Sequence, residues 1–325
     1  MTTSTKDRTG FGILLICIGV LAISVNDFLI KYLSDGYPLH QIVFARSAIG
    51  LVFSLVFVQI EGGIRILRTS TPGLHILRGL FVVAANLSFY AAVAVLPLAQ
   101  ATALFFIAPL FITLLSIPFL GESVGMRRMT AVVVGFVGVI VMQQPWTNEI
   151  SVSRTVLLLP VVSAFLYASM QIMTRRLGTT TPASALAVYI QSMFLVVSLA
   201  FFVVAGDGRF AEGATNDSVI FLLREWMWPA AQDMPIFIGL GVCSGIIGYA
   251  LSAAYKNAAA ATIAPFEYCG LPLAIFWGWL IFGEWPDVMT WIGCALIIGA
   301  GVFVFVREQQ VSQRAPGARR RWARR

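Results

Sequence analysis

Three ionisable residues interrupt long apolar stretches of this 325-residue chain, and they are the first candidates for chemistry. Asp27 lies in the stretch 11–33, Arg46 in the stretch 38–60 and Glu267 in the stretch 262–282. A charged side chain is costly in hydrocarbon, so it faces a partner or a water-filled cavity and commonly marks a site of function. We therefore interpret these residues as a site for substrate binding or ion coupling.

Asp27 and Arg46 lie at similar depths in neighbouring apolar stretches. Asp27 is six residues from the end of its stretch and Arg46 is eight residues into the next. At ~1.5 Å per helical residue, they lie about 9 and 12 Å below the same surface. The spacing predicts an Asp27–Arg46 ion pair, with Lys31, one turn beyond Asp27, as a rival partner. Whether the pair braces the fold or contacts a substrate stays open.

Glu267 stands in the segment PFEYCGLP, between Pro265 and Pro272. Two prolines and a glycine can interrupt a membrane helix and free backbone carbonyls for binding. The sequence offers no evident cationic partner at the depth of Glu267. We therefore expect this carboxylate either to be held protonated by burial or to bind a proton or a cationic substrate group.

Neutral polar residues supply further lining candidates. Asn86 and Tyr90 are four positions apart and so share one face of the stretch 74–95, while Tyr249 and Tyr255 add polarity to the stretch 235–256. Hydrogen bonds between helices are the alternative role for such side chains.

Motifs for catalysis are missing from the sequence. It contains no H-E-x-x-H, no G-x-S-x-G and no G-x-x-x-x-G-K-[ST], and it has only two histidines, His40 and His75. The four cysteines fall in apolar stretches without metal-ligand spacing. We expect neither an enzyme nor a bound metal or cofactor.

The composition is that of a membrane protein. The chain is 58% hydrophobic and 11% charged, with a mean hydropathy of +0.86, whereas soluble domains are roughly 25% charged. Ten apolar runs each approach the ~20 residues that span a bilayer. We predict an all-α integral membrane protein of ten transmembrane helices, at 11–33, 38–60, 74–95, 101–120, 129–145, 155–176, 184–205, 235–256, 262–282 and 288–306.

Two segments of the chain repeat one pattern. Residues 109–122 read PLFITLLSIPFLGE and residues 272–284 read PLAIFWGWLIFGE, with their Gly-Glu pairs 162 residues apart. Five helices make an odd-numbered copy, so the second copy would enter the membrane inverted. We predict two inverted five-helix repeats, at 11–145 and 155–306, an architecture in which secondary transporters bind their substrate between the repeats.

The distribution of basic residues predicts the orientation. With a cytoplasmic N-terminus, 17 Lys and Arg, Arg78 among them, fall on the cytoplasmic side and 4 on the outer side, which is a strong positive-inside bias. Both termini are then cytoplasmic, and the basic tail 307–325 is expected to contact anionic lipid rather than nucleic acid. The segment 206–234 lies outside, with a short amphipathic helix at 218–228. An uncleaved first helix is favoured over a signal peptide.

Several motifs, in order, resemble those of the drug/metabolite transporter superfamily with EamA-type five-helix units. The resemblance covers roughly residues 11–306 and is nearest to the S-adenosylmethionine uptake transporters. It rests on Asn26-Asp27, Lys31-Tyr32-Leu33, Phe44-Ala45-Arg46, His75-Ile76-Leu77-Arg78-Gly79, Pro109-Leu110-Phe111, Glu122, Gly135-Phe136-Val137-Gly138, Val141-Met142 and Pro145. The resemblance implies ten helices, cytoplasmic termini and a central cavity formed by both repeats.

The expected function is secondary transport of a small polar organic metabolite, S-adenosylmethionine or a related compound, across a bacterial inner membrane by alternating access. Relatives that carry riboflavin, amino acids or drugs, inward or outward, supply the alternatives. A channel or a lipid scramblase is the alternative from another class. A proton as coupling ion and a homodimer remain open.

Overall fold

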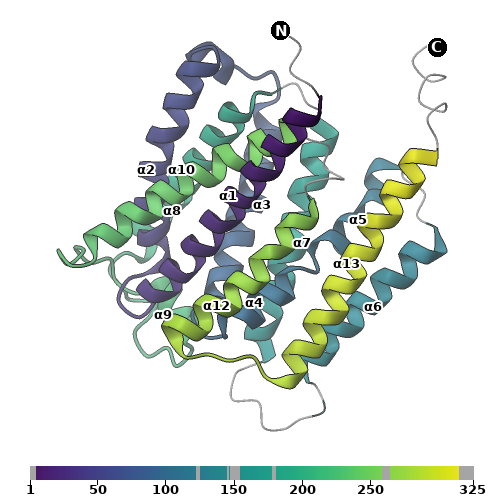
Figure 1. The fold of residues 1–325 in the computed structure, drawn as a ribbon. Coiled ribbons are helices and arrows are strands. Elements are labelled where there is room, and N and C mark those ends of the chain that lie inside the picture. Colours follow the sequence, from purple (N-terminus) through teal and green to yellow (C-terminus); the bar gives the residue numbers. More distant parts are fainter. Residues whose placement is uncertain are drawn as a thin grey trace.

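The computed structural model describes residues 5–121, 125–144, 146, 154–177, 181–257 and 264–314, and all regular elements in these ranges are helices (Figure 1). The elements are α1 (Thr5–Leu33), α2 (Leu39–Glu61), η1 (Ile64–Leu67), α3 (Pro72–Val93), α4 (Leu98–Phe105), α5 (Ala108–Leu120), α6 (Met126–Gln143), α7 (Arg154–Leu177), α8 (Ala183–Ala205), α9 (Asp217–Leu223), α10 (Met234–Asn257), η2 (Ala264–Cys269), α12 (Gly270–Phe282) and α13 (Val288–Arg314).

Most helices have the length and apolar composition of membrane spans. Within the described residues, seven helices meet both conditions, and three shorter apolar helices lie at 129–143, 266–282 and 288–303. Large apolar side chains on the helices are exposed, such as Val52 at 62% and Val203 at 80%. Exposed apolar surface of this extent suits lipid rather than water. The chain is therefore a multi-pass membrane protein.

Two of the predicted helices are broken, each just before a proline. The first stops at Phe105 and resumes as α5, and the second is the 3-10 helix η2 followed by α12. Pro109 and Pro272 have no N–H to donate to the carbonyl four residues earlier, and the proline ring also clashes with that carbonyl. The interruption within 262–282 agrees with the expectation that its prolines and glycine can interrupt a helix, whereas no interruption was expected within 101–120.

The two breaks face each other, and the helices beyond them end alike. The ring of Phe106, at the first break, lies 5.3 Å from the ring of Tyr268, in η2. Helix α5 is capped by Gly121 and α12 by Gly283, with left-handed φ values of 68° and 65°. Glycine adopts this conformation without the penalty that a Cβ carries.

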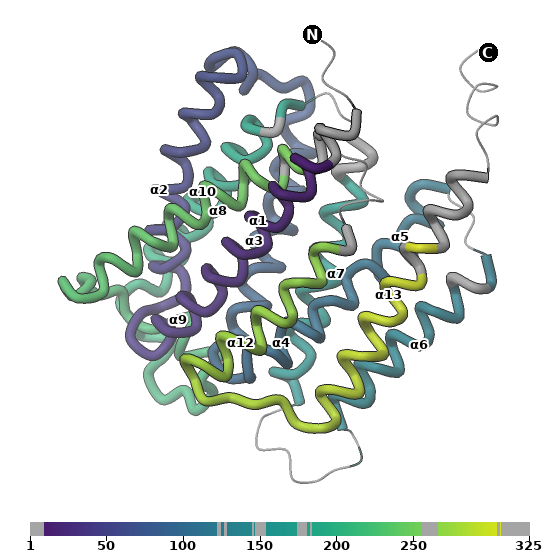
Figure 2. The backbone as a smooth tube through the Cα atoms, viewed as in Figure 1, coloured from purple at the N-terminus to yellow at the C-terminus, as the bar shows by residue number. Residues whose placement is uncertain are grey.

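Helices from the two halves of the sequence pack against each other. The main packing partners are α1 with α10, α6 with α13, α3 with α7, α2 with α8 and with α10, and α5 with α7; α4 packs against α12 less extensively. Figure 2 shows α6 and α13 side by side at one edge of the bundle and α2, α8 and α10 at the other. Helix α1 begins and α13 ends at the same end of the bundle (Figure 1).

The opposite end of the bundle carries a cap built from the segment after α8. Helix α9 ends at Leu223, short of the predicted 218–228, and Arg224 then donates hydrogen bonds to the carbonyl oxygens of Ser34 and Asp35. The Trp226 indole packs 4.3 Å from the ring of Phe202, whereas Trp228 is 89% exposed.

Candidate functional site

Asp27 of α1 and Arg46 of α2 are both buried, but they do not form an ion pair. The Tyr90 hydroxyl donates to Oδ1 of Asp27 over 2.8 Å and accepts from Nδ2 of Asn26 over 2.8 Å. Oδ1 of Asn26 in turn accepts from Nη1 of Arg46 over 3.4 Å. The two charges are therefore linked through neutral side chains.

The Arg46 guanidinium is held by amides and aromatic rings. Its Nη2 donates to Oδ1 of Asn86. The guanidinium carbon lies 5.5 Å from the centre of the Tyr90 ring and 5.1 Å from that of Phe194, distances at which a cation is attracted to a ring face. Its Nε is buried and has no hydrogen-bond partner among the described residues.

The predicted direct ion pair between Asp27 and Arg46 was wrong, although the two residues lie in one cluster. The position of a residue within a predicted span gives its height along the helix, but not the direction in which its side chain points. Asn26 and Tyr90 occupy the space between the carboxylate and the guanidinium. Asn26 and Phe194 also belong to this cluster and were not predicted; the adjacent Asn-Asp pair is the available sequence signal for Asn26.

Lys31, the predicted rival partner of Asp27, binds a different carboxylate. Its Nζ lies 2.6 Å from Oε1 of Glu284 and 2.7 Å from the carbonyl oxygen of Leu96. Oε2 of Glu284 accepts from the backbone N–H of Leu98 over 3.1 Å. This arrangement, the Lys31–Glu284 clasp, joins the end of α1, the start of α4 and the end of α12.

Glu267 lies in η2, where it interacts with a second polar group of residues. The Glu267 carboxylate interacts electrostatically with the hydroxyls of Tyr167 and Tyr268, and Arg78 interacts electrostatically with Tyr167. Arg78 is only 6% exposed. Arg78 of α3 is therefore buried within the bundle rather than exposed in a loop, although the charge count grouped it with the cations of the cytoplasmic side. It lies eight residues, or about 12 Å, along that helix from Asn86.

The remaining sequence candidates lie elsewhere. The ring of Tyr249 stacks on that of Phe57 at 4.0 Å, and Tyr249 is 38% exposed. The side chain of Tyr255 lies outside the part of the chain that the structure describes, as do Glu122 and residues 315–325.

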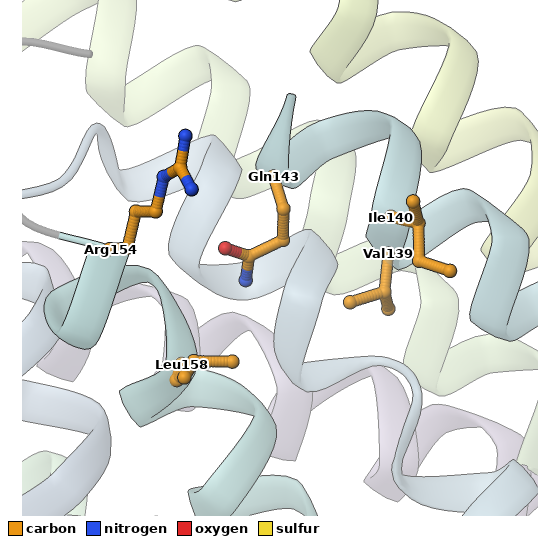
Figure 3. Close-up of a pocket in the computed structure, with 5 residues that line it drawn as sticks. All are labelled: Val139, Ile140, Gln143, Arg154 and Leu158. Atoms are coloured by element: carbon orange, nitrogen blue, oxygen red, sulfur yellow. The ribbon is translucent and has the colours of Figure 1, made fainter. Parts of the chain in front are cut away.

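A separate pocket lies between α6 and α7 (Figure 3). Its volume is about 290 Å³, and it is lined by Val139, Ile140, Gln143, Arg154 and Leu158. The amide of Gln143 is already engaged, because its Nε2 donates to the carbonyl oxygen of Leu157 over 2.8 Å. The lining is mostly apolar, so the pocket suits a polar metabolite less well than the buried cluster around Arg46.

Comparisons with known proteins point in one direction. The family model for the EamA-like transporter family matches residues 10–143. A riboflavin transporter of Vibrio cholerae is 30% identical over 315 residues, covering 96% of this chain and 98% of its own length. An S-adenosylmethionine uptake transporter of Rickettsia felis is 28% identical over 306 residues, covering 94% of this chain and 95% of its own length.

A solved structure shares the fold. It is a crystal structure of a protein, and it aligns with this chain at a TM-score of 0.58 and 17% sequence identity. The alignment covers 95% of this chain and 99% of the chain in the crystal structure.

Proposed function

This chain belongs to the EamA-like transporter family, and we propose that it is a secondary transporter that moves a small polar organic metabolite across the bacterial inner membrane by alternating access. One observation carries the proposal. Oppositely charged Asp27 and Arg46 are buried in an apolar bundle without neutralising each other by contact. Burying two charges in this way costs free energy that a purely structural role does not explain, and it provides charged groups that can bind a polar molecule.

The packing supports ten spans arranged as two inverted repeats, at 11–145 and 155–306. When each span is exchanged for the span five positions along, the contact of α1 with α10 becomes that of α7 with α3, and the contact of α1 with α12 becomes that of α7 with α5. All four contacts are present. The shared position of α1's start and α13's end favours termini on one side, which we place in the cytoplasm together with the tail 307–325.

The substrate site in this proposal is the cluster of Asp27, Arg46, Asn86 and Tyr90, with Tyr249 and Tyr255 as more peripheral candidates. Glu267 is proposed as the group that couples transport to a proton.

The Lys31–Glu284 clasp joins the two halves of the chain at the end of the bundle where α1 ends. A carrier that opens toward that side has to separate these two residues in every cycle.

The substrate is proposed as S-adenosylmethionine or a related metabolite, with riboflavin, amino acids and drugs as alternatives. Relatives of nearly full length include both a riboflavin transporter and an S-adenosylmethionine uptake transporter, so overall similarity does not choose between them.

Counterflow in proteoliposomes tests the function. Vesicles preloaded with unlabelled S-adenosylmethionine or riboflavin should accumulate the labelled compound transiently and saturably. A carrier gives this stimulation by substrate on the opposite side. Flux that does not saturate and does not depend on the substrate inside the vesicles would instead favour a channel. Movement of labelled phospholipid between leaflets would favour a scramblase.

A further inference from the structure

We infer that Arg46 binds the carboxylate of the transported substrate, and that the substrates are therefore zwitterionic amino-acid derivatives. This inference rests on the transport function proposed above and assigns a substrate class to the same site.

Arg46 is a buried cation with only neutral partners. Its hydrogen bonds go to the amide oxygens of Asn26 and Asn86, and its faces lie near the rings of Tyr90 and Phe194. No carboxylate forms an ion pair with it among the described residues. Lys31, the other buried cation described in detail, has Glu284 at 2.6 Å. Arg46 thus keeps a positive charge that a bound anion could neutralise.

The geometry of the guanidinium favours a carboxylate over other anions. Arginine presents its N–H donors in a planar fork that matches the two oxygens of a carboxylate. Nη2 is held by Asn86 and the neighbouring rings restrict rotation, so the orientation of the fork is set before a ligand arrives. Nε is buried without a partner, and a buried donor without an acceptor is a cost that a carboxylate oxygen would remove.

Asp27 supplies the opposite charge for the same ligand. It shares Tyr90 and Asn26 with Arg46, so the two charges belong to one hydrogen-bonded cluster. An amino-acid derivative carries a cationic amine beside its carboxylate, and the pair Asp27 and Arg46 matches both ends. Riboflavin has no carboxylate, and the site offers it no such match. The side chains around Arg46 must separate to admit any ligand, as alternating access requires.

Matched ligands test the inference without any mutation. Counterflow of labelled S-adenosylmethionine would be competed with unlabelled S-adenosylmethionine, decarboxylated S-adenosylmethionine and riboflavin. Loss of two charge-assisted hydrogen bonds should weaken competition by the decarboxylated compound about 100-fold or more. Equal competition by the two S-adenosyl compounds would overturn the inference while leaving the transport function intact.

Variants of Arg46 provide a second test of the inference. Arg46→Gln should weaken S-adenosylmethionine about as much as removing the carboxylate does, and Arg46→Lys, which keeps the charge but loses the fork, should fall between. Arg209→Gln, in an exposed loop where the side chain is 58% exposed, is the control and should transport as the parent does. S-adenosylmethionine transport that is unchanged in Arg46→Gln would overturn the inference. Absence of flux for every compound in the parent would count against both the inference and the proposed function.

Discussion

Lys31 and Glu284 lie 253 positions apart in the sequence, and their side chains meet with 2.6 Å between Nζ and Oε1. The exposed fractions of the two side chains are 9% and 26%, so the pair is partly shielded from water. Each partner also binds backbone of the α3–α4 connection, at Leu96 and Leu98. The clasp therefore joins three segments by hydrogen bonds as well as by charge.

Breaking the clasp should destabilise the protein. Lys31→Met leaves the Glu284 carboxylate without its cation, and losing one partner of a buried pair costs ~3–5 kcal/mol, with less expected here because Glu284 is partly exposed. The thermal unfolding midpoint in detergent should fall, and the double variant Lys31→Met with Glu284→Gln should recover part of the loss. Arg209→Gln, which breaks the exposed pair with Asp207, should leave the midpoint unchanged. Additive losses in the double variant would contradict the coupling.

The hydroxyl of Tyr90 should contribute to the stability of the protein. Tyr90→Phe removes the donor to Asp27 and the acceptor for Asn26, and a buried polar group left unsatisfied costs about 1–3 kcal/mol. The unfolding midpoint should therefore drop. Tyr32→Phe is the matched control, because Tyr32 is 54% exposed.

Exchanging the charges of Asp27 and Arg46 tests whether these residues interact directly. The double variant Asp27→Arg with Arg46→Asp should be no more stable than the single variants, since no direct ion pair joins the two residues. Recovery of stability in the double variant would show that they do interact directly.

Glycines set the distance between α6 and α13. A Cβ added at Gly138 would lie 3.0 Å from the carbonyl oxygen of Gly293, whereas a Cβ at Gly299 of α13 would have nothing within 4 Å. Close approach of membrane helices through small residues is a general packing mode. Gly138→Ala should thus lower the unfolding midpoint through overpacking, worth about 1–3 kcal/mol. Gly299→Ala should leave it unchanged or raise it slightly, because alanine is the better helix former. A similar response to both substitutions would argue against a close contact between α6 and α13.

Hydropathy located the helices well because their length is set by the thickness of the bilayer. The stretch predicted at 184–205 is α8, Ala183–Ala205, and that predicted at 38–60 is α2, Leu39–Glu61. Proline marked both helix breaks, although the sequence alone did not show that a proline would stop the helix rather than bend it.

The candidate site was harder to predict for geometric reasons. Asp27, Arg46, Asn86 and Tyr90 do gather, since each lies at a similar depth in a neighbouring helix. Their hydrogen-bond partners depend on how each helix is rotated about its axis, which hydropathy does not report. The Lys31–Glu284 clasp also depends on packing between distant parts of the sequence. The burial of Arg78 was not expected, because the residue lies near the start of the predicted span 74–95 and was counted with the basic residues of the cytoplasmic side.

Labelling of single cysteines tests the orientation. In a cysteine-free background, Thr215→Cys, in the cap segment after α8, should react with a membrane-impermeant maleimide added to spheroplasts. Ile64→Cys, in η1 and 73% exposed at the opposite connection, should react only after permeabilisation. The reverse pattern would place the termini outside the cytoplasm and overturn the orientation drawn from the basic residues.

Glu267→Gln should separate proton coupling from substrate exchange. The substitution keeps the shape of the side chain and mimics its protonated form, so the folded state near Tyr167 and Tyr268 should be retained. If the carboxylate carries the coupling proton, the variant should lose accumulation driven by a pH gradient but keep counterflow of substrate for substrate. The control is Glu225→Gln, at an exposed position after α9, which should keep both activities. Unchanged gradient-driven accumulation in Glu267→Gln would leave Glu267 with a structural role beside Tyr167, and the coupling residue would then have to be sought among Asp27 and its neighbours.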